Sequence, residues 1–268
     1  MFVKTKTKIT MKKLICFACF IALSLTSCSS GGDSSPATES DVLLKKTVET
    51  YAIDGSTVTT NYTYNGMKLV RSVDSDGVRD EYTYTSDLIT NIKTYDSDVL
   101  MQEQLFTYNG SSQLVTYLIK DYDGGEGHKD SYVYNSNGTV SLITYKGDTT
   151  SQTDLLNTGT VYFTNGDVTR VDLNVTDVVS YTSSQIDTYD TKNNPFKNVT
   201  GMDKLSFIGG EVGGLTHNVL TDHYTSSLSS PVDATTTYTY NSLNFPLTDS
   251  EIEGTDATSV ISIVYTYN

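Results

Sequence analysis

Aromatic and apolar residues alternate with polar residues along most of this chain. Pairs of aromatic residues recur at positions i and i+2, as in Tyr62-Thr63-Tyr64 and Tyr82-Thr83-Tyr84. Side chains at i and i+2 lie on the same face of a β-strand, so each pair marks a strand with one aromatic face. No apolar pattern of helical period and length separates these pairs. The alternation therefore predicts strands and little helix.

The aromatic pairs belong to a degenerate internal repeat. Most pairs are followed by Asn-Gly, Thr-Ser or Asn-Ser, which favour tight hairpin turns. An apolar residue such as Leu69 or Leu114 comes next, and then an acidic or glycine-rich turn, as at 74–77 and 123–125. Each unit is thus a predicted hairpin of two short strands. Copies start at Tyr62, Tyr82, Phe106, Tyr132, Val161, Val179, Tyr238 and Tyr265.

Hairpins in series predict an all-β fold over residues 41–268. We expect a long antiparallel β-meander of roughly twelve to sixteen strands that forms one twisted or curled sheet. A parallel sheet would need a crossover of about a dozen or more residues between strands. The pattern does not decide whether the sheet stays open or closes on itself.

One irregular insert, at about 190–215, interrupts the repeat. Pro195 and the glycines at 209, 210, 213 and 214 prevent a continuous strand ladder there. Two interpretations remain for this insert: a cap that covers the sheet, which we favour, or a loop that contacts a ligand.

The first 27 residues are a predicted signal peptide. Lys12 and Lys13 precede a twelve-residue apolar stretch, 14–25, and Met11 is the better start. As a helix this stretch spans roughly 18 Å, short of the roughly 30 Å hydrocarbon core of a bilayer. The sequence Leu-Thr-Ser-Cys at 25–28 resembles the lipobox of bacterial lipoproteins. The resemblance implies cleavage before Cys28 and a covalent lipid on its thiol.

Residues 28–40 form a predicted Gly/Ser-rich tether between the lipid and the repeat domain. Ser29 follows Cys28, so the aspartate that retains such lipoproteins at the inner membrane is absent. By analogy with that family we expect a lipid-anchored protein of the outer membrane. The side of the membrane that it faces is left open.

The repeats also resemble known sequence families. Tyr64-Asn65, Tyr108-Asn109, Tyr134-Asn135 and Tyr240-Asn241 resemble the Tyr-Asp dipeptides of YD repeats in the RHS family, with Asn in place of Asp. The whole chain resembles exported outer-membrane lipoproteins of Gram-negative bacteria with YD-like sheets, including an Asn-Asn-Pro-Phe segment at 193–196. This resemblance implies long arrays of β-hairpins and supplies no catalytic residue.

Composition excludes several classes of partner and site. The segment before Cys28 holds five of the 18 basic residues and none of the 32 acidic ones, so the chain from Cys28 onward has a net charge of −19. Such a charge argues against nucleic acid as a partner, and against contact with an anionic membrane beyond the lipid. No cysteine remains after Cys28 for a disulfide, a thiolate nucleophile or a Cys-based zinc site.

Residues with catalytic or metal-binding chemistry are few. His128, His217 and His223 are the only histidines, and the Asp-Gly turns at 74–77 and 121–124 lack the remaining ligands of a calcium loop. No nucleophile elbow, phosphate loop or zinc-protease motif occurs. We predict no enzyme, no metal and no cofactor other than the lipid on Cys28.

The tyrosine pairs allow two interpretations, packing against a core, which we favour, or a binding face for a protein or glycan. The expected function is a membrane-anchored structural or binding module without enzymatic activity. A glycan-binding accessory lipoprotein that uses exposed tyrosines is one alternative, and a periplasmic or surface hydrolase is another. The candidate binding face consists of Tyr62, Tyr64, Tyr82, Tyr84, Tyr132 and Tyr134.

Overall fold

The computed structural model describes residues 38–210 and 215–268, which form sixteen β-strands and four short 3-10 helices. The strands are β1 (Leu44–Tyr51), β2 (Thr57–Asn65), β3 (Lys68–Asp74), β4 (Val78–Thr85), β5 (Leu88–Asp96), β6 (Val99–Tyr108), β7 (Leu114–Asp121), β8 (Glu126–Tyr134), β9 (Val140–Asp148), β10 (Gln152–Thr164), β11 (Asp167–Val175), β12 (Tyr181–Tyr189), β13 (Val219–Ser226), β14 (Ser229–Tyr240), β15 (Pro246–Glu253) and β16 (Ile261–Tyr267). The 3-10 helices are η1 (Glu39–Asp41), η2 (Met202–Lys204), η3 (Ile208–Gly210) and η4 (Ala257–Ser259). Within these described ranges, no helix has the length and apolar character needed to cross a membrane.

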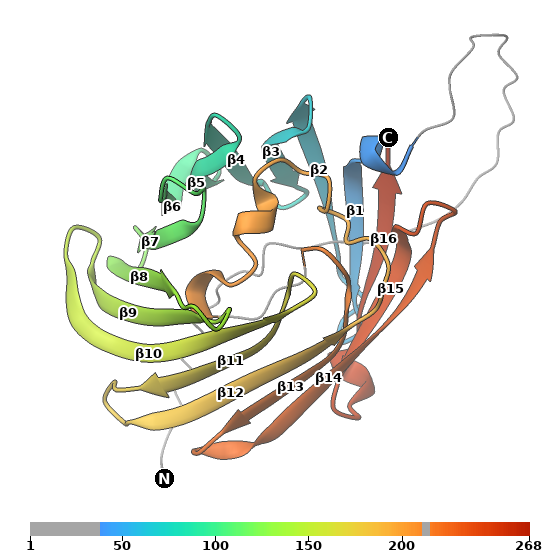
Figure 1. Ribbon diagram of the computed structural model, residues 1–268. Helices are drawn as coiled ribbons and strands as arrows, with labels where there is room; N and C mark the ends of the chain where they lie inside the picture. Colours follow the sequence, from blue (N-terminus) through green and yellow to red (C-terminus); the bar gives the residue numbers. More distant parts are fainter. Residues whose placement is uncertain (1–37, 211–214) are drawn as a thin grey trace, which may run out of the picture.

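Each strand pairs antiparallel with the next one in the chain, and β1 also pairs with β16, so the sheet closes into a barrel (Figure 1). The predicted all-β antiparallel meander with little helix is confirmed. The expectation of a single twisted or curled sheet is corrected, because the sheet has no free edge.

A recurrent β-bulge favours the curvature that closure requires. The register slips by one residue immediately before the second aromatic of a pair, as between Thr63 and Tyr64 in β2 and between Thr83 and Tyr84 in β4. The same slip occurs in β6, β10 and β14. A bulge bends its strand and increases the local twist. Repeated around the sheet at one level, it curls the sheet until β1 meets β16.

Turn chemistry divides the barrel into two ends. The turns that leave even-numbered strands follow the aromatic pairs and lie at one end, together with the start of β1 and the end of β16. We call this end the aromatic mouth. In its β10–β11 turn, Asn165 and Gly166 both have positive φ (54° and 92°), as a tight hairpin turn requires. The turns that leave odd-numbered strands form the opposite end, the far mouth.

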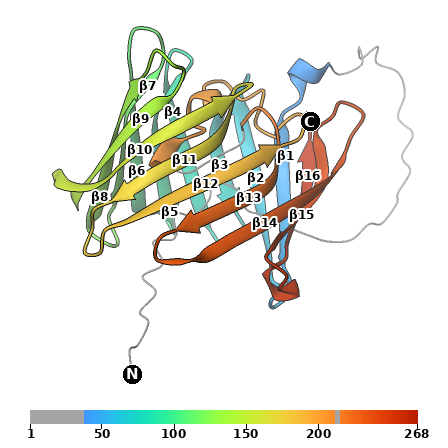
Figure 2. The ribbon, with the colours of Figure 1, turned by 60° about the horizontal axis from the view of Figure 1, so that its bottom comes forward.

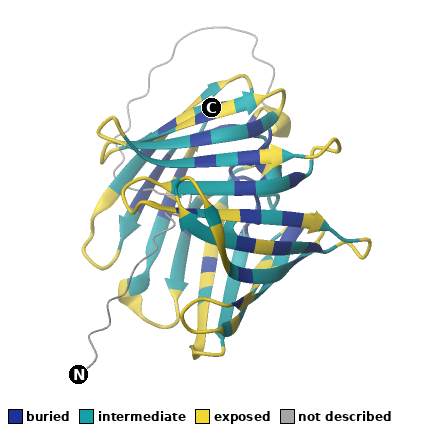
Figure 3. Ribbon diagram, turned by 90° about the vertical axis from the view of Figure 1, so that its left-hand side faces the viewer, coloured by how far each residue is buried: buried dark blue, intermediate teal, exposed yellow. Residues whose placement is uncertain are grey.

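In strands such as β2 and β4, buried residues alternate with more exposed ones, and Figure 3 shows buried and exposed positions along the ribbon. Tyr62, Tyr82 and Ile92 are buried, whereas their neighbours Thr63 and Thr83 are exposed. The buried set faces inward, where it packs against the chain between β12 and β13. That segment lies within the ring of strands in both views (Figure 1, Figure 2). The hydrophobic core is therefore inside the barrel.

Candidate binding site in the barrel interior

The described residues between β12 and β13, 190–210 and 215–218, fold into the barrel from the aromatic mouth (Figure 1), and we call them the plug. The Phe196 ring meets the Tyr62 ring edge to face, with 5.6 Å between centroids. Phe207 does the same with Tyr132 at 5.1 Å and Phe163 at 5.6 Å. The plug thus contributes five buried side chains to the core, and the strands of the wall contribute most of the others. Its buried apolar side chains are Phe196, Val199, Met202, Leu205 and Phe207.

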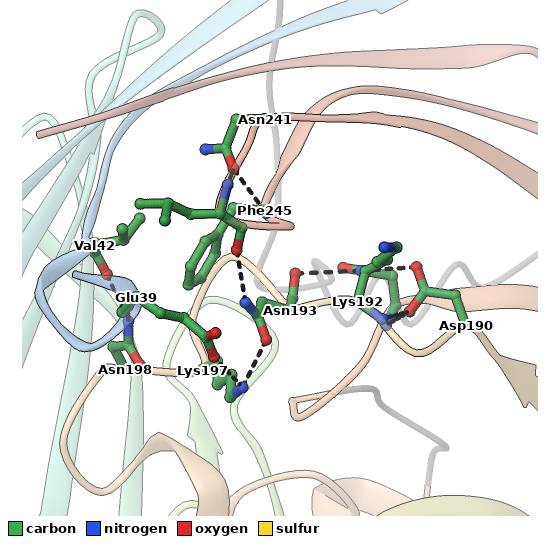
Figure 4. Close-up of polar contacts among 11 residues, drawn as sticks. Glu39, Val42, Asp190, Lys192, Asn193, Lys197, Asn198, Asn241 and Phe245 are labelled. Carbon is green, nitrogen blue, oxygen red and sulfur yellow. Dashed lines mark hydrogen bonds and ion pairs between the residues drawn. The ribbon is translucent and has the colours of Figure 1, made fainter. Parts of the chain in front are cut away.

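Polar contacts fix the plug to the rim of the aromatic mouth (Figure 4). The Asn193 side-chain amide donates to the Leu243 carbonyl at 2.9 Å, and that of Asn198 donates to the Val42 carbonyl at 3.0 Å. Lys197 forms an ion pair of 2.8 Å with Glu39. These contacts tie the plug to the β14–β15 turn and to the chain that precedes β1.

Close backbone packing and a buried carboxylate hold the plug deeper in the barrel. Gly201 has φ 79°, and a side chain there would place its Cβ 2.7 Å from the Asp87 carbonyl oxygen. Asp130 accepts hydrogen bonds from the Gly209 amide (3.0 Å), the Thr144 hydroxyl (2.7 Å) and the Tyr132 hydroxyl. Burial raises the pKa of the Asp130 carboxyl, and these donors oppose the rise. Asp130 therefore joins β8 and β9 to the plug.

The tyrosines of the candidate binding face do not form an exposed platform. Tyr62, Tyr82 and Tyr132 are buried, and Tyr64, Tyr84 and Tyr134 are half-buried and pack on the same core. Burial raises the pKa of Tyr84 to about 12. These tyrosines pack on the core because the aromatic pairs lie on the inner side of the wall, which the plug covers. Their role as a binding face stays a prediction.

Between the plug and the far mouth, the inner wall becomes polar. Many of its inward-facing side chains are only half-buried, although they lie inside the ring of strands. A sixteen-stranded barrel is wide enough for a hydrated interior. We call this region the cup. Its inward-facing residues include Asp80, Thr94, Gln102, Gln185, Asp222, Tyr224 and Glu251.

Carboxylates in the cup are arranged in hydrogen-bonded groups. Asp187 and Asp222 stand opposite each other on β12 and β13, and the Gln185 amide donates to both, at 3.5 and 3.1 Å. Like charges directly across a ladder repel, and the bridging amide offsets part of this repulsion. The cup thus offers carboxylate acceptors beside amide donors. This chemistry suits a neutral or cationic polar ligand.

Asp249 is a carboxylate of the interior whose pKa is raised well above the usual value of an aspartate. It is buried beside Ile263, accepts a hydrogen bond of 2.6 Å from the Tyr265 hydroxyl and lies near Glu251. Burial raises the pKa of Asp249 to about 7, and the nearby Glu251 acts in the same direction. Asp249 therefore titrates near neutral pH.

The outer wall carries a ladder of alternating charges. Arg71, Glu81, Lys93, Glu103 and Lys120 are directly opposed in register across β3 to β7. Arg71, Glu81, Lys93 and Glu103 each sit next to a buried inward residue in their own strand, and Lys120 stands directly opposite Glu103, so all five point away from the interior. The amino groups of Lys93 and Lys120 lie 3.6 and 4.0 Å from the Glu103 carboxylate. This part of the outer wall therefore carries a row of paired opposite charges.

The histidines are placed apart from one another. His217 belongs to the plug and bonds Asp167 at 2.6 Å, whereas His223 points outward from β13 and bonds Asp233 at 2.6 Å. His128 lies within β8. Across residues 38–210 and 215–268, no group of three or more His, Cys, Asp or Glu side chains could hold a metal ion. Cys28 lies outside the described residues.

The sequence analysis did not predict the group of inward-facing polar residues that lines the cup. Gln185, Asp187 and Tyr189 share the parity of an inward face in β12, so alternation could have predicted that they lie together. The carboxylate of Asp249 could not be found in this way, since its surroundings come from β16 and β14.

Comparisons with known proteins support the fold alone. No known family model matches the sequence, and no curated protein matches it. The chain is similar to the crystal structure of a porin-like protein from Bacteroides vulgatus ATCC 8482, with a TM-score of 0.58 and 12% identity over 85% of this chain and 99% of that one. It is also similar to a porin-like protein from Bacteroides uniformis ATCC 8492, with a TM-score of 0.51 and 14% identity over 84% of this chain and 98% of that one.

Proposed function

We propose that this protein is an exported lipoprotein of the bacterial outer membrane that acts as a non-enzymatic binding module. The lipid on Cys28 holds it to the membrane, and the barrel wall stays in water. The observation that carries this proposal is the outward charge ladder from Arg71 to Lys120. A transmembrane barrel needs an apolar outer band, and each Lys or Arg at its midplane costs about 2–4 kcal/mol.

The plug supports binding rather than conduction. Porins leave an aqueous channel through the barrel, but here Phe196 and Phe207 pack across the interior on opposite parts of the wall. The interior is then a cup that opens at the far mouth. Its polar lining, with carboxylates bridged by Gln185, fits a neutral or cationic polar ligand.

Detergent phase partition tests the proposal. The mature lipidated protein should enter the detergent-rich phase of Triton X-114. A variant with Cys28→Ser, exported behind a cleavable signal without a lipobox, should move to the aqueous phase and stay monodisperse without detergent. Retention of this variant in the detergent phase would show a wall that binds lipid and would refute the proposal.

Glycan binding is a second candidate function, with the binding site on the outer wall and not at the tyrosines. A hollow of about 430 Å³ over β11 to β13 is lined by hydroxyl, amide and charged groups. Within it, Asp172 accepts hydrogen bonds of 2.7 Å from both Arg170 and Ser184. Binding of soluble oligosaccharides that is abolished by Asp172→Ala would support it. Binding that survives this change would exclude the hollow. Its polar lining residues include Arg170, Asp172, Asn174, Thr182, Ser184 and Thr225.

A further inference from the structure

The two mouths of the barrel differ in charge. Counted from the last residue of one strand to the first of the next, the eight connections of the far mouth contain twelve acidic residues and neither Lys nor Arg. At the aromatic mouth, the described connections and chain ends contain six acidic residues and four lysines. The far-mouth acids are Asp54, Asp74, Asp76, Asp96, Asp98, Asp121, Asp123, Glu126, Asp148, Asp177, Glu253 and Asp256.

The geometry of the turns does not require more acidic residues at the far mouth than at the aromatic mouth. At the far mouth, Asp74 Oδ1 accepts from the amides of Asp76 and Val78, at 2.9 and 2.8 Å. At the aromatic mouth, Asn109 Oδ1 accepts from the amides of Ser111 and Gln113 in the same i+2 and i+4 pattern, at 2.9 and 3.1 Å. Asparagine and aspartate cap such turns equally well. The carboxylates thus add charge at one end without a gain in capping.

The chain start is fixed at the aromatic mouth. Asn268 bonds both the amide of Leu43 (2.8 Å) and the carbonyl of Asp41 (2.9 Å), and Asn198 of the plug bonds the carbonyl of Glu39. Ten residues connect Cys28 to Thr38, a reach of about 35 Å at full extension. The far mouth lies a further barrel height away, about 23 Å for a nine-residue strand such as β2 tilted by about 40°.

We propose that the aromatic mouth is the surface that faces the lipid bilayer, so that the far mouth and its cup point away from the membrane. The inference rests on the proposed lipid anchor. The tether attaches at this mouth, and its acids are partly matched by lysines, as in the pairs Lys197–Glu39 and Lys68–Asp87. Anionic headgroups would repel the unmatched acids of the far mouth, by about 1 kcal/mol for each charge close to the surface.

Single cysteines in the full-length lipidated protein test this orientation. The only other cysteine after signal cleavage is the lipidated one, so a thiol-reactive fluorophore labels one position. Ser111→Cys and Ser136→Cys report on the aromatic mouth, and Ala52→Cys and Ala257→Cys report on the far mouth; all four positions are exposed. Each labelled protein is reconstituted into phosphatidylethanolamine–phosphatidylglycerol vesicles that carry a headgroup nitroxide quencher.

We expect quenching several-fold stronger at the two aromatic-mouth positions. Equal quenching at both mouths, or stronger quenching at the far mouth, in protein that floats with the vesicles would overturn the orientation and leave the anchor intact. Failure to float would overturn the anchor, and the orientation with it. The triple change Asp74→Asn, Asp121→Asn and Asp148→Asn keeps the turn caps and should narrow the ratio between mouths. An unchanged ratio would refute the electrostatic part of the inference.

Discussion

The inner and outer walls of the barrel are made by the same strands, yet they differ in what holds them together. In β4, Tyr82 faces inward and is buried, whereas Thr83 faces outward and is exposed. The inner wall is stabilised by apolar burial against the plug, whereas part of the outer wall carries cross-strand polar pairs such as Lys93 and Glu103. One step along a strand therefore changes the expected cost of a substitution by several kcal/mol.

The sharpest test of this contrast is alanine substitution at neighbouring positions. Tyr82→Ala should lower the free energy of unfolding by about 3–5 kcal/mol, because it leaves a cavity between the wall and the core. Thr83→Ala should change it by under about 0.5 kcal/mol, as exposed substitutions do. Urea denaturation of both variants measures the difference. Equal, small effects would mean that the aromatic pairs do not pack the interior.

The next test compares the pKa of a buried carboxyl on the inner wall with that of an exposed carboxyl in a turn. Burial raises the pKa of Asp249 to about 7, above the value of an unfolded chain. The folded state then binds the proton more tightly than the unfolded one. Its contribution to stability is present below about pH 4 and is lost as the pH rises through about 7.

The expected outcome is a pH-dependent gain for Asp249→Asn. Relative to wild type, this variant should gain about 2–3 kcal/mol in free energy of unfolding between pH 5 and pH 8. Asp256→Asn is the matched control at an exposed far-mouth turn, where hydrogen bonds from Thr258 lower the pKa of the carboxyl. A gain for Asp249→Asn that is the same at both pH values would show that this carboxyl is not protonated in the fold.

The sequence predicts the local elements of this architecture but not its closure. Pairs such as Tyr62 and Tyr64 predict the strands, the hairpins and the antiparallel order, because their spacing is local. Closure depends on the bulge before Tyr64 and on the pairing of β1 with β16, and alternation encodes neither. Likewise, Pro195 and the glycines identify the irregular insert but not the side of the sheet that it packs against.

In the candidate site, too, local features can be predicted from the sequence and long-range contacts cannot. Parity assigns Tyr82 and Asp80 to one face, but the sequence does not show whether that face is the inside of a barrel. The tyrosine face was therefore open to two interpretations. The contacts of Tyr62 with Phe196 and of Tyr132 with Phe207, which are distant in sequence, favour packing. Long-range packing is the information that a single sequence lacks.

The smallest expected effect concerns the outer charge ladder. Glu103 lies between Lys93 and Lys120, but all three side chains are partly exposed, and exposed ion pairs contribute about 0.2–1 kcal/mol. Glu103→Gln should therefore lower the free energy of unfolding by under about 1 kcal/mol, and 1 M salt should reduce that difference, because salt screens exposed charges. A double-mutant cycle with Lys93→Met, measured by urea denaturation, isolates the pair. A coupling above about 2 kcal/mol, or one insensitive to salt, would indicate a desolvated ladder and would remove the distinction between the two walls.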